Sequence, residues 1–189
     1  MRIAGGDWRG RTLKVPDSDA VRPTQDRVRE ALFSMIQFEL AGVSFLDLFA
    51  GSGGVGLEAL SRGAARATFV ELAPRHVACL KANVVALKAE TRCRIQTADV
   101  FSWLAALPTR AAAADDAFDI VYADPPYDLG HERGFTAILQ TLADKNAVKP
   151  SGLFIAEMRV HQTPDESPFW ELCRDRTYGQ TRLAIYRRT

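Results

Sequence analysis

The sequence is poor in residues that bind metals or form disulfides. Its 189 residues include three cysteines, Cys79, Cys93 and Cys173, and three histidines, and no two cysteines stand in a C-x-x-C spacing. Zinc sites and disulfide frameworks need such residues at close, paired spacings. We therefore expect reduced, buried thiols and no metal site.

Long apolar runs and leader-like segments are also missing. No apolar stretch approaches the ~20 residues that a membrane-spanning helix needs, and the residues from Met1 to Asp7 lack the apolar core of a signal peptide. The composition, with 47% hydrophobic and 25% charged residues, is ordinary for a soluble globular protein. We expect a cytoplasmic protein that does not bind a membrane.

Positive charge is concentrated at the two ends of the chain. Residues 1–29 carry a net charge of +3 and residues 174–189 a net charge of +4, whereas the whole chain carries +1, so the residues between them carry −6. Basic ends on an acidic body suit a surface that faces phosphate. Ordinary solvated charge is the alternative interpretation.

Apolar runs alternate with helical patterns from about residue 25 onward. This alternation predicts an α/β fold with a mostly parallel seven-stranded sheet, helices on both faces and a C-terminal antiparallel hairpin. The expected strands are 43–50, 67–72, 93–99, 118–123 and 152–158, followed by a hairpin of 174–178 and 182–187, and the expected helices are 25–40, 55–63, one from Pro74, 100–107 and 135–142.

The first twenty residues differ from the rest. Two short β-like runs, residues 2–4 and 12–15, are interrupted by glycines and carry basic side chains around an aromatic ring. This pattern predicts a basic β-hairpin extension over 1–20, followed by a single domain over 21–189. Basic residues with an aromatic among them suit RNA; a hairpin that only covers the core is the alternative.

A glycine-rich turn follows the first strand. Gly51-x-Gly53-x-x-Gly56 fits the dinucleotide pattern and predicts a close approach of backbone to a ligand at a helix N-terminus. The nearby acids Asp47 and Glu71 would repel a pyrophosphate and suit a ligand that carries a cation and hydroxyl donors. S-adenosylmethionine has a sulfonium, an α-amine and ribose hydroxyls, so the turn favours this methyl donor over NAD.

A second constellation ends the strand at 118–123. Asp124-Pro125-Pro126-Tyr127 offers an anionic acceptor, a backbone carbonyl and a flat aromatic face at the carboxyl end of a strand, where α/β folds bind ligands. These groups suit the exocyclic amine of a nucleobase. A strand that merely ends in a Pro-Pro turn is the alternative.

Taken together, residues 47–53 (DLFAGSG) and 124–127 (DPPY) resemble class I S-adenosylmethionine-dependent methyltransferases that act on amine nitrogens. The N-terminal strings 2–11 (RIAGGDWRGR), 22–24 (RPT) and 26–33 (DRVREALF) resemble the RsmD family, and so do 57–64 (LEALSRGA) and the terminal Tyr178-Gly179. Ala4 and Ser34 depart from the usual residues of that family without touching the predicted chemistry.

The resemblance implies methylation of guanine N2 in bacterial 16S ribosomal RNA, within a small subunit or an assembly intermediate. The absence of an obvious extra apolar element favours a monomer, and the scattered histidines and cysteines favour a protein without metal. The resemblance also implies catalytic roles for Asp124, Pro125, Pro126 and Tyr127. Expected cofactor-binding residues are Asp47, Phe49, Ala50, Gly51, Ser52, Gly53, Glu71, Leu72, Asp99, Val100 and Thr24. Candidate RNA-binding residues are Arg2, Trp8, Arg9, Arg11, Arg22 and Arg27; whether Arg22 and Thr24 serve the cofactor or the RNA stays open.

Three alternatives carry weight at this point. An adenine-N6 DNA methyltransferase uses the same acid-proline-proline chemistry, but only some 42 residues precede the core, which leaves little room for a target-recognition region. A binding module without activity is disfavoured by the intact acids Asp47, Glu71, Asp99 and Asp124. An NAD oxidoreductase is disfavoured by Asp47.

Overall fold

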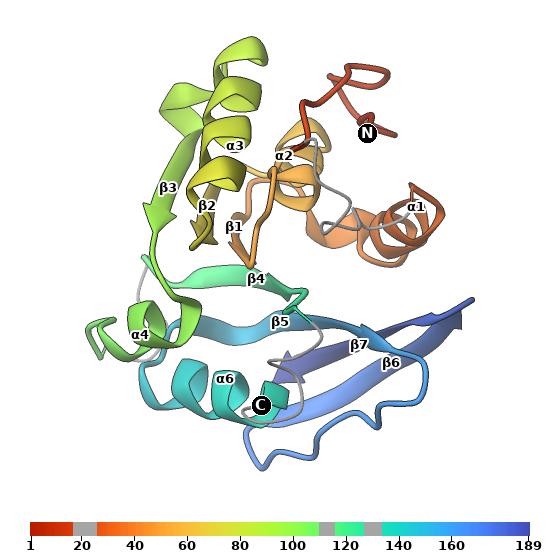
Figure 1. Cartoon of the computed structure of the whole chain (residues 1–189). Helices are drawn as coiled ribbons and strands as arrows, with labels where there is room; N and C mark the ends of the chain where they lie inside the picture. The colour runs from red at the N-terminus through yellow and green to blue at the C-terminus, as the bar shows by residue number, and fades with distance from the viewer. Residues whose placement is uncertain (17–25, 110–115, 127–133) are drawn as a thin grey trace. The chain divides into compact units, whose positions relative to one another are not determined.

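The structure, a computed structural model, describes residues 1–16, 26–109, 116–126 and 134–189 (Figure 1). Contacts within the chain divide it into two compact units, Met1–Asp99 and Val100–Thr189. The predicted boundary near residue 20 lies outside the described residues, as do Arg22, Thr24 and Tyr127.

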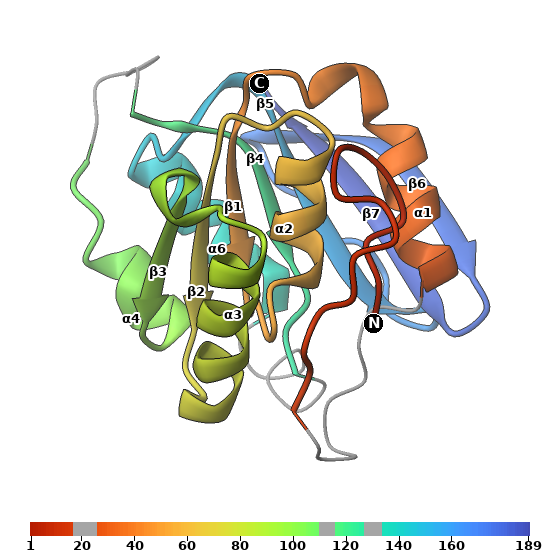
Figure 2. The same cartoon turned by 90° about the horizontal axis from the view of Figure 1, so that it is seen from above.

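Three parallel strands in the order β3-β2-β1 form the sheet of the first unit. Helix α2 packs on β1 and β2, and α3 packs on β2 and β3; both lie on the same face of these strands (Figure 2). The elements are α1 (Asp26–Met35), the 3-10 turn η1 (Gln37–Glu39), β1 (Ser44–Leu48), α2 (Gly54–Ser61), β2 (Arg66–Glu71), α3 (Pro74–Ala86), η2 (Glu90–Arg92) and β3 (Cys93–Thr97).

The sequence patterns explain these elements. All five residues of β1 are buried, as expected for an apolar run in a parallel sheet. Pro74 occupies the first turn of α3, where its missing N–H costs nothing. The predicted helix 25–40 was too long: α1 ends at Met35, and a 3-10 turn follows in which Phe38 is 93% exposed.

The N-terminal segment is a hairpin-shaped loop without regular strands. Its arms are joined by an isolated antiparallel bridge between Arg2 and Thr12 and by the bond from Ile3 N to Arg11 O. The predicted β-hairpin was therefore right in its reversal of direction and wrong in its strands.

Helix α2 holds the tip of this loop. Backbone N–H groups of the loop are donated to this helix: that of Asp7 to the carbonyl of Ser61, and that of Trp8 to the Ser61 hydroxyl. A Cβ on Gly6 would lie 1.9 Å from the Ser61 carbonyl oxygen, so only glycine permits this close approach.

A buried carboxylate joins this loop to two helices. Glu58 in α2 is fully buried and accepts from the guanidinium of Arg29 at 2.6 Å, from that of Arg62 at 2.7 Å, and from the backbone N–H of Ala4. Arg29 also donates to the carbonyl of Arg2. These bonds connect α1, α2 and the N-terminal loop through a single side chain.

The second unit holds four strands in the order β4-β5-β7-β6, of which β4 and β5 are parallel and the others antiparallel. Its core surrounds Phe154, whose ring packs against Phe135, Trp170 and Tyr186 with centroids about 6 Å apart. The elements are α4 (Val100–Ala105), β4 (Phe118–Ala123), α6 (Gly134–Asp144), β5 (Val148–Arg159), β6 (Trp170–Tyr178) and β7 (Thr181–Arg188).

All seven predicted strands are present, with the predicted directions of the paired strands.

The expectation that the three cysteines are reduced and buried was only partly right. All three are free, but Cys173 is exposed and Cys79 and Cys93 are half-buried. Burial raises the pKa of the Cys93 thiol to about 12, which makes it a poor nucleophile at neutral pH.

Within the described ranges, no helix is long and apolar enough to cross a membrane.

Removal of the Glu58 carboxylate is expected to destabilise the protein strongly. In Glu58→Ala the buried guanidinium of Arg29 loses its main counter-charge, which in buried pairs costs about 3–5 kcal/mol. Urea unfolding followed by circular dichroism measures the change in the free energy of unfolding. Glu30→Ala, an exposed position on α1, is the control and should change it by less than about 0.5 kcal/mol; equal effects of both variants would contradict a structural role for Glu58.

Candidate functional site

The glycine turn between β1 and α2 adopts a backbone that few residues tolerate. Phe49, Gly51 and Gly53 have φ angles of 59°, 55° and 84°. A Cβ on Gly53 would meet the side chain of Leu80 at 2.3 Å, whereas one on Gly51 would meet nothing within 4 Å. Gly53 therefore serves packing, and Gly51 borders open space in which a ligand can approach the backbone.

Asp47 holds the turn between β1 and α2 through a hydrogen bond with its backbone. This residue of β1 is 1% exposed, and its Oδ2 accepts from the backbone N–H of Gly56 at 2.8 Å. Burial is the main reason that the pKa of Asp47 is raised to about 8; the bond from Gly56 lowers it, and the nearby Glu71 raises it further. A cation beside this carboxyl would restore its ionised form.

Glu71, the last residue of β2, fixes the other side of the turn. Its Oε2 accepts from the backbone N–H of Gly51 at 2.8 Å, and its Oε1 from that of Ala73 at 2.7 Å. A carboxylate has about four acceptor positions. The side chain is therefore held in place by the backbone and retains capacity for ligand hydroxyl groups.

Two more predicted residues lie at the same edge of the first unit. The backbone N–H of Ala98 donates to the carbonyl of Glu71, which brings the segment after β3, including Asp99, beside the end of β2. Leu72 is 61% exposed next to Glu71 and offers an apolar contact at this edge. The structure thus gathers Asp47, residues 49–53, Glu71, Leu72 and Asp99; Val100 belongs to the second unit.

Asn83 of α3 links this turn to the N-terminal loop. Its amide donates to the carbonyls of Ser52 and Lys14 and accepts from the backbone N–H of Lys14 at 2.7 Å. Met1 also lies against the turn, because a Cβ on Gly54 would meet its thioether end at 2.7 Å. The position of the turn and that of the N-terminal loop therefore depend on each other.

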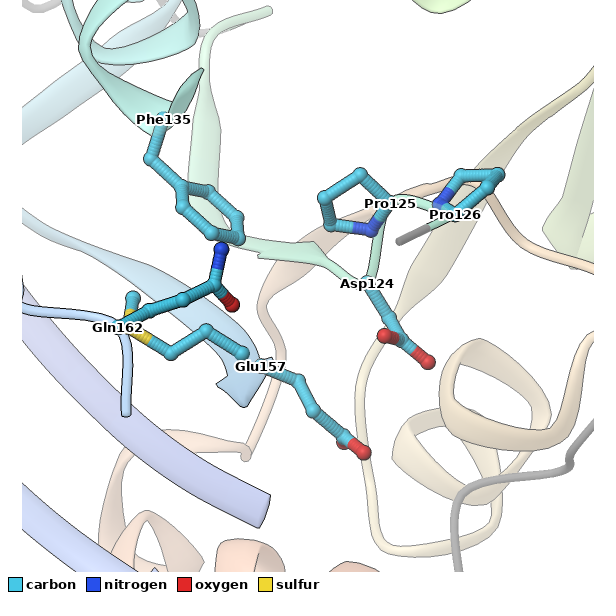
Figure 3. A pocket seen from close by; sticks show the side chains of 7 residues that line it. Asp124, Pro125, Pro126, Phe135, Glu157 and Gln162 are labelled. Atoms are coloured by element: carbon cyan, nitrogen blue, oxygen red, sulfur yellow. The ribbon is translucent and has the colours of Figure 1, made fainter. Parts of the chain in front are cut away.

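In the second unit, Asp124, Pro125 and Pro126 follow the carboxyl end of β4 and line a cavity together with Phe135, Glu157, Met158 and Gln162 (Figure 3). Asp124 and Pro125 are half-buried, and Pro126 is exposed. The cavity combines carboxylates with apolar walls, a composition that suits a flat heterocycle with hydrogen-bond donors.

The whole chain matches known proteins. Residues 1–187 match the family model described as "Conserved hypothetical protein 95". The chain is 38% identical, over 100% of its length and 90% of the relative's, to "Ribosomal RNA small subunit methyltransferase D" of Escherichia coli. It is 34% identical to "Putative rRNA methyltransferase YlbH" of Bacillus subtilis, over 100% of its length and 99% of that protein's.

A solved structure extends the match to the fold. "Putative methyltransferase yhhF from Escherichia coli" superposes with a TM-score of 0.85 at 36% identity, covering 100% of this chain and 97% of that one. The chain belongs to the RsmD family of methyltransferases. This match confirms the predicted α/β methyltransferase fold, and the DNA-adenine alternative finds no support among these relatives.

The candidate RNA-binding residues of this RsmD-family chain are distributed unevenly. Arg2, Arg9, Arg11 and Arg27 are exposed. Arg11 donates to the carbonyl of Ala86, so it also attaches the loop to α3. The ring of Trp8 is half-buried and lies under the guanidinium of Arg92 at 5.6 Å; one of its faces therefore already has a cationic partner.

Sequence reasoning missed several residues at these sites. Glu157 follows the apolar run 153–156 of β5 as Asp124 follows the apolar end of β4, and this shared pattern was visible in the sequence. Asn83 gave no local signal, because its partner Lys14 is 69 residues away in the chain. Glu58 showed only its i,i+4 pairing with Arg62, and its other partners, Arg29 and Ala4, are 29 and 54 residues away. No cluster of three or more possible metal ligands occurs in the part of this RsmD-family chain that the structure describes.

The raised pKa of Asp47 predicts a specific pH dependence of stability. The pKa rises from 3.8 to about 8 on folding, so ionisation opposes folding: the contribution of Asp47 is greatest below pH 4 and is lost as the pH rises toward 8. Asp47→Asn keeps the acceptor for Gly56 without the charge. We expect the Tm difference between Asp47→Asn and wild type to grow from pH 5 to pH 8 in the ligand-free protein.

Asp7→Asn, an exposed position, is the matched control for the thermal melts. Its Tm difference from wild type should be independent of pH. A flat difference for Asp47→Asn would mean that this carboxyl is ionised at no cost in the folded protein.

Proposed function

We propose that this protein transfers the methyl group of S-adenosylmethionine to the exocyclic N2 of a specific guanine in 16S ribosomal RNA. The observation that carries the proposal is the match of residues 1–187 to a family whose relatives are named as small-subunit ribosomal RNA methyltransferases. The cofactor and the reaction at an amine are inferred from the chemistry of the two sites, and guanine N2 is inferred from the RsmD family.

The residues of the first unit fit the cofactor. The open space over Gly51, the buried carboxyl of Asp47 and the backbone-held carboxylate of Glu71 suit a ligand with a cation and ribose hydroxyls. Asp99 is proposed to accept from the adenine amine, and Leu72, which is exposed, to pack against the ring. S-adenosylmethionine supplies a methyl group activated by its sulfonium. Phe49, Ala50, Ser52, Gly53 and Val100 complete the proposed cofactor contacts, with Thr24 as a further candidate.

The residues of the second unit fit the target amine. The N2 lone pair of guanine is delocalised into the ring, so this amine is a poor nucleophile. Acceptance of its two N–H groups by the Asp124 carboxylate and the Pro125 carbonyl allows the nitrogen to become pyramidal. Pro125 and Pro126 restrict the backbone, so these acceptors are positioned before the base arrives. Tyr127 is proposed to stack on the base, which is worth about 1–3 kcal/mol.

The reaction is then a single displacement. The N2 lone pair attacks the methyl carbon, an N–C bond forms, the C–S bond breaks, and its electron pair stays on sulfur to leave S-adenosylhomocysteine. The nitrogen loses one proton, to Asp124 or to water. No metal or redox partner takes part in this balance.

The proposed setting follows from the substrate. The relatives' names specify small-subunit ribosomal RNA, so we propose action in the cytoplasm on a 30S subunit or an assembly intermediate, by a monomer. The exposed arginines of the N-terminal loop, together with Arg27 and Arg22, are proposed to contact RNA phosphates, and Trp8 a base.

Replacement of Asp124 tests the chemistry. Asp124→Ala should lower kcat by at least about 100-fold, because it removes an acceptor used most strongly in the transition state, while the affinity for S-adenosylhomocysteine by calorimetry stays within about twofold. Activity is followed as tritiated methyl transfer to small-subunit particles that lack the modification, with nucleoside analysis. Asp144→Ala, exposed on α6, should behave as wild type. Methyl on adenine N6, or unimpaired turnover by Asp124→Ala, contradicts the proposal.

Replacement of Arg9 tests the RNA-binding surface. Arg9→Ala should weaken binding to the RNA substrate and lower the slope of log Kd against log salt by about 0.7–0.9, the loss of a single phosphate contact. Arg66→Ala, an exposed arginine at the amino end of β2, is the control and should leave the slope unchanged. If both variants keep the wild-type slope, the N-terminal loop does not face phosphate.

A further inference from the structure

Glu157 lies beside the proposed catalytic acid. In the parallel pairing of β4 with β5, Ala123 is opposite Ala156, so Asp124 and Glu157 are the next residues along two adjacent strands. Both line the same cavity, and their side chains extend in the same direction from their strands (Figure 3).

A hydrogen bond fixes the face on which Glu157 lies. The hydroxyl of Tyr122 donates to Oε2 of Glu157 at 2.5 Å. Tyr122 and Asp124 are two residues apart, so they point to the same side of β4, and Glu157 joins them there. Tyr122 is 2% and Glu157 8% exposed; the phenol therefore holds a nearly buried carboxylate in a defined rotamer beside the cavity.

The Watson–Crick edge of guanine complements this arrangement. Guanine presents two adjacent donors, N1–H and the N2 amine, whereas adenine presents an acceptor at N1 beside its N6 amine. A carboxylate next to Asp124 would therefore bind guanine and repel adenine. Because each carboxylate has about four acceptor positions, the bond from Tyr122 leaves capacity for such a donor.

We propose that Glu157 determines the base specificity of the reaction by accepting the N1–H of the target guanine, while Asp124 accepts from N2, and that Tyr122 is its positioning residue. This proposal rests on the proposed function. It assigns recognition of the base to a residue that the acid-proline-proline motif does not contain, and it explains how a motif shared with adenine chemistry selects guanine.

The experiment changes the base and the side chain together. Small-subunit particles are assembled with guanine or 2-aminopurine at the target position; 2-aminopurine keeps the N2 amine and has an acceptor at N1. In Glu157→Gln, the amide oxygen of the new side chain still accepts from the hydroxyl of Tyr122, and its NH2 group then faces the base. Wild type should prefer guanine over 2-aminopurine in kcat/KM, and Glu157→Gln should reduce that preference by about 10- to 100-fold, as expected for a lost charge-assisted hydrogen bond.

Glu171→Gln, the same substitution at an exposed position on β6, is the control and should keep the wild-type preference. Comparison between variants cancels the different intrinsic reactivity of the two amines.

If Glu157 only anchors Tyr122, Glu157→Gln lowers kcat/KM equally for both bases, and the proposal is overturned. If wild type and Glu171→Gln place no methyl on guanine at all, the proposed function itself is wrong, a result distinct from an unchanged preference. If Glu157→Gln does not fold, Tyr122→Phe takes its place in the same comparison, because it removes the hydroxyl that positions Glu157; a wild-type preference in Tyr122→Phe contradicts the proposal.

Discussion

Buried acidic side chains position much of the first unit. A buried carboxylate is stable only when N–H or O–H groups surround it, so each one dictates where a piece of backbone or a cation must lie. Asp47 requires the N–H of Gly56, Glu71 requires those of Gly51 and Ala73, and Glu58 requires two guanidinium groups. The glycine turn and the N-terminal loop are positioned largely by these demands.

The same bonds prepare the protein for its ligands. Because Glu71 and Asp47 hold the glycine turn in the absence of a ligand, little of the free energy of binding is spent on ordering the turn. Asn83 extends this rigidity to the N-terminal loop through Lys14 and Ser52. A structural residue on α3 thus couples the proposed cofactor edge to the proposed RNA-binding loop.

The sequence predicted what depends on local patterns. Apolar runs located all seven strands, and the glycine spacing located the turn, because both are determined by neighbouring residues. Long-range partners were not predictable. Arg29 was one of several arginines in an expected helix, and nothing nearby indicates its ion pair with Glu58, 29 residues away. The N-terminal strands failed for the same reason, since the N–H of Ala4 is donated to Glu58 of α2 and that of Lys14 to Asn83 of α3. The end of α1 at Met35 was missed because the apolar spacing continues through Ile36 and Leu40, which flank the 3-10 turn Gln37–Glu39.

The position of Glu157 changes how the acid-proline-proline motif is understood. An acid and a carbonyl can activate any exocyclic amine, so the motif determines the reaction and leaves the base undetermined. The choice between guanine and adenine depends on the group beside the amine, which is a donor in guanine and an acceptor in adenine. In our proposal that group meets Glu157 of the adjacent parallel strand β5, the residue next to the pair formed by Ala123 and Ala156. Specificity in this fold is therefore expected to vary with the strand next to the motif, while the motif itself stays the same.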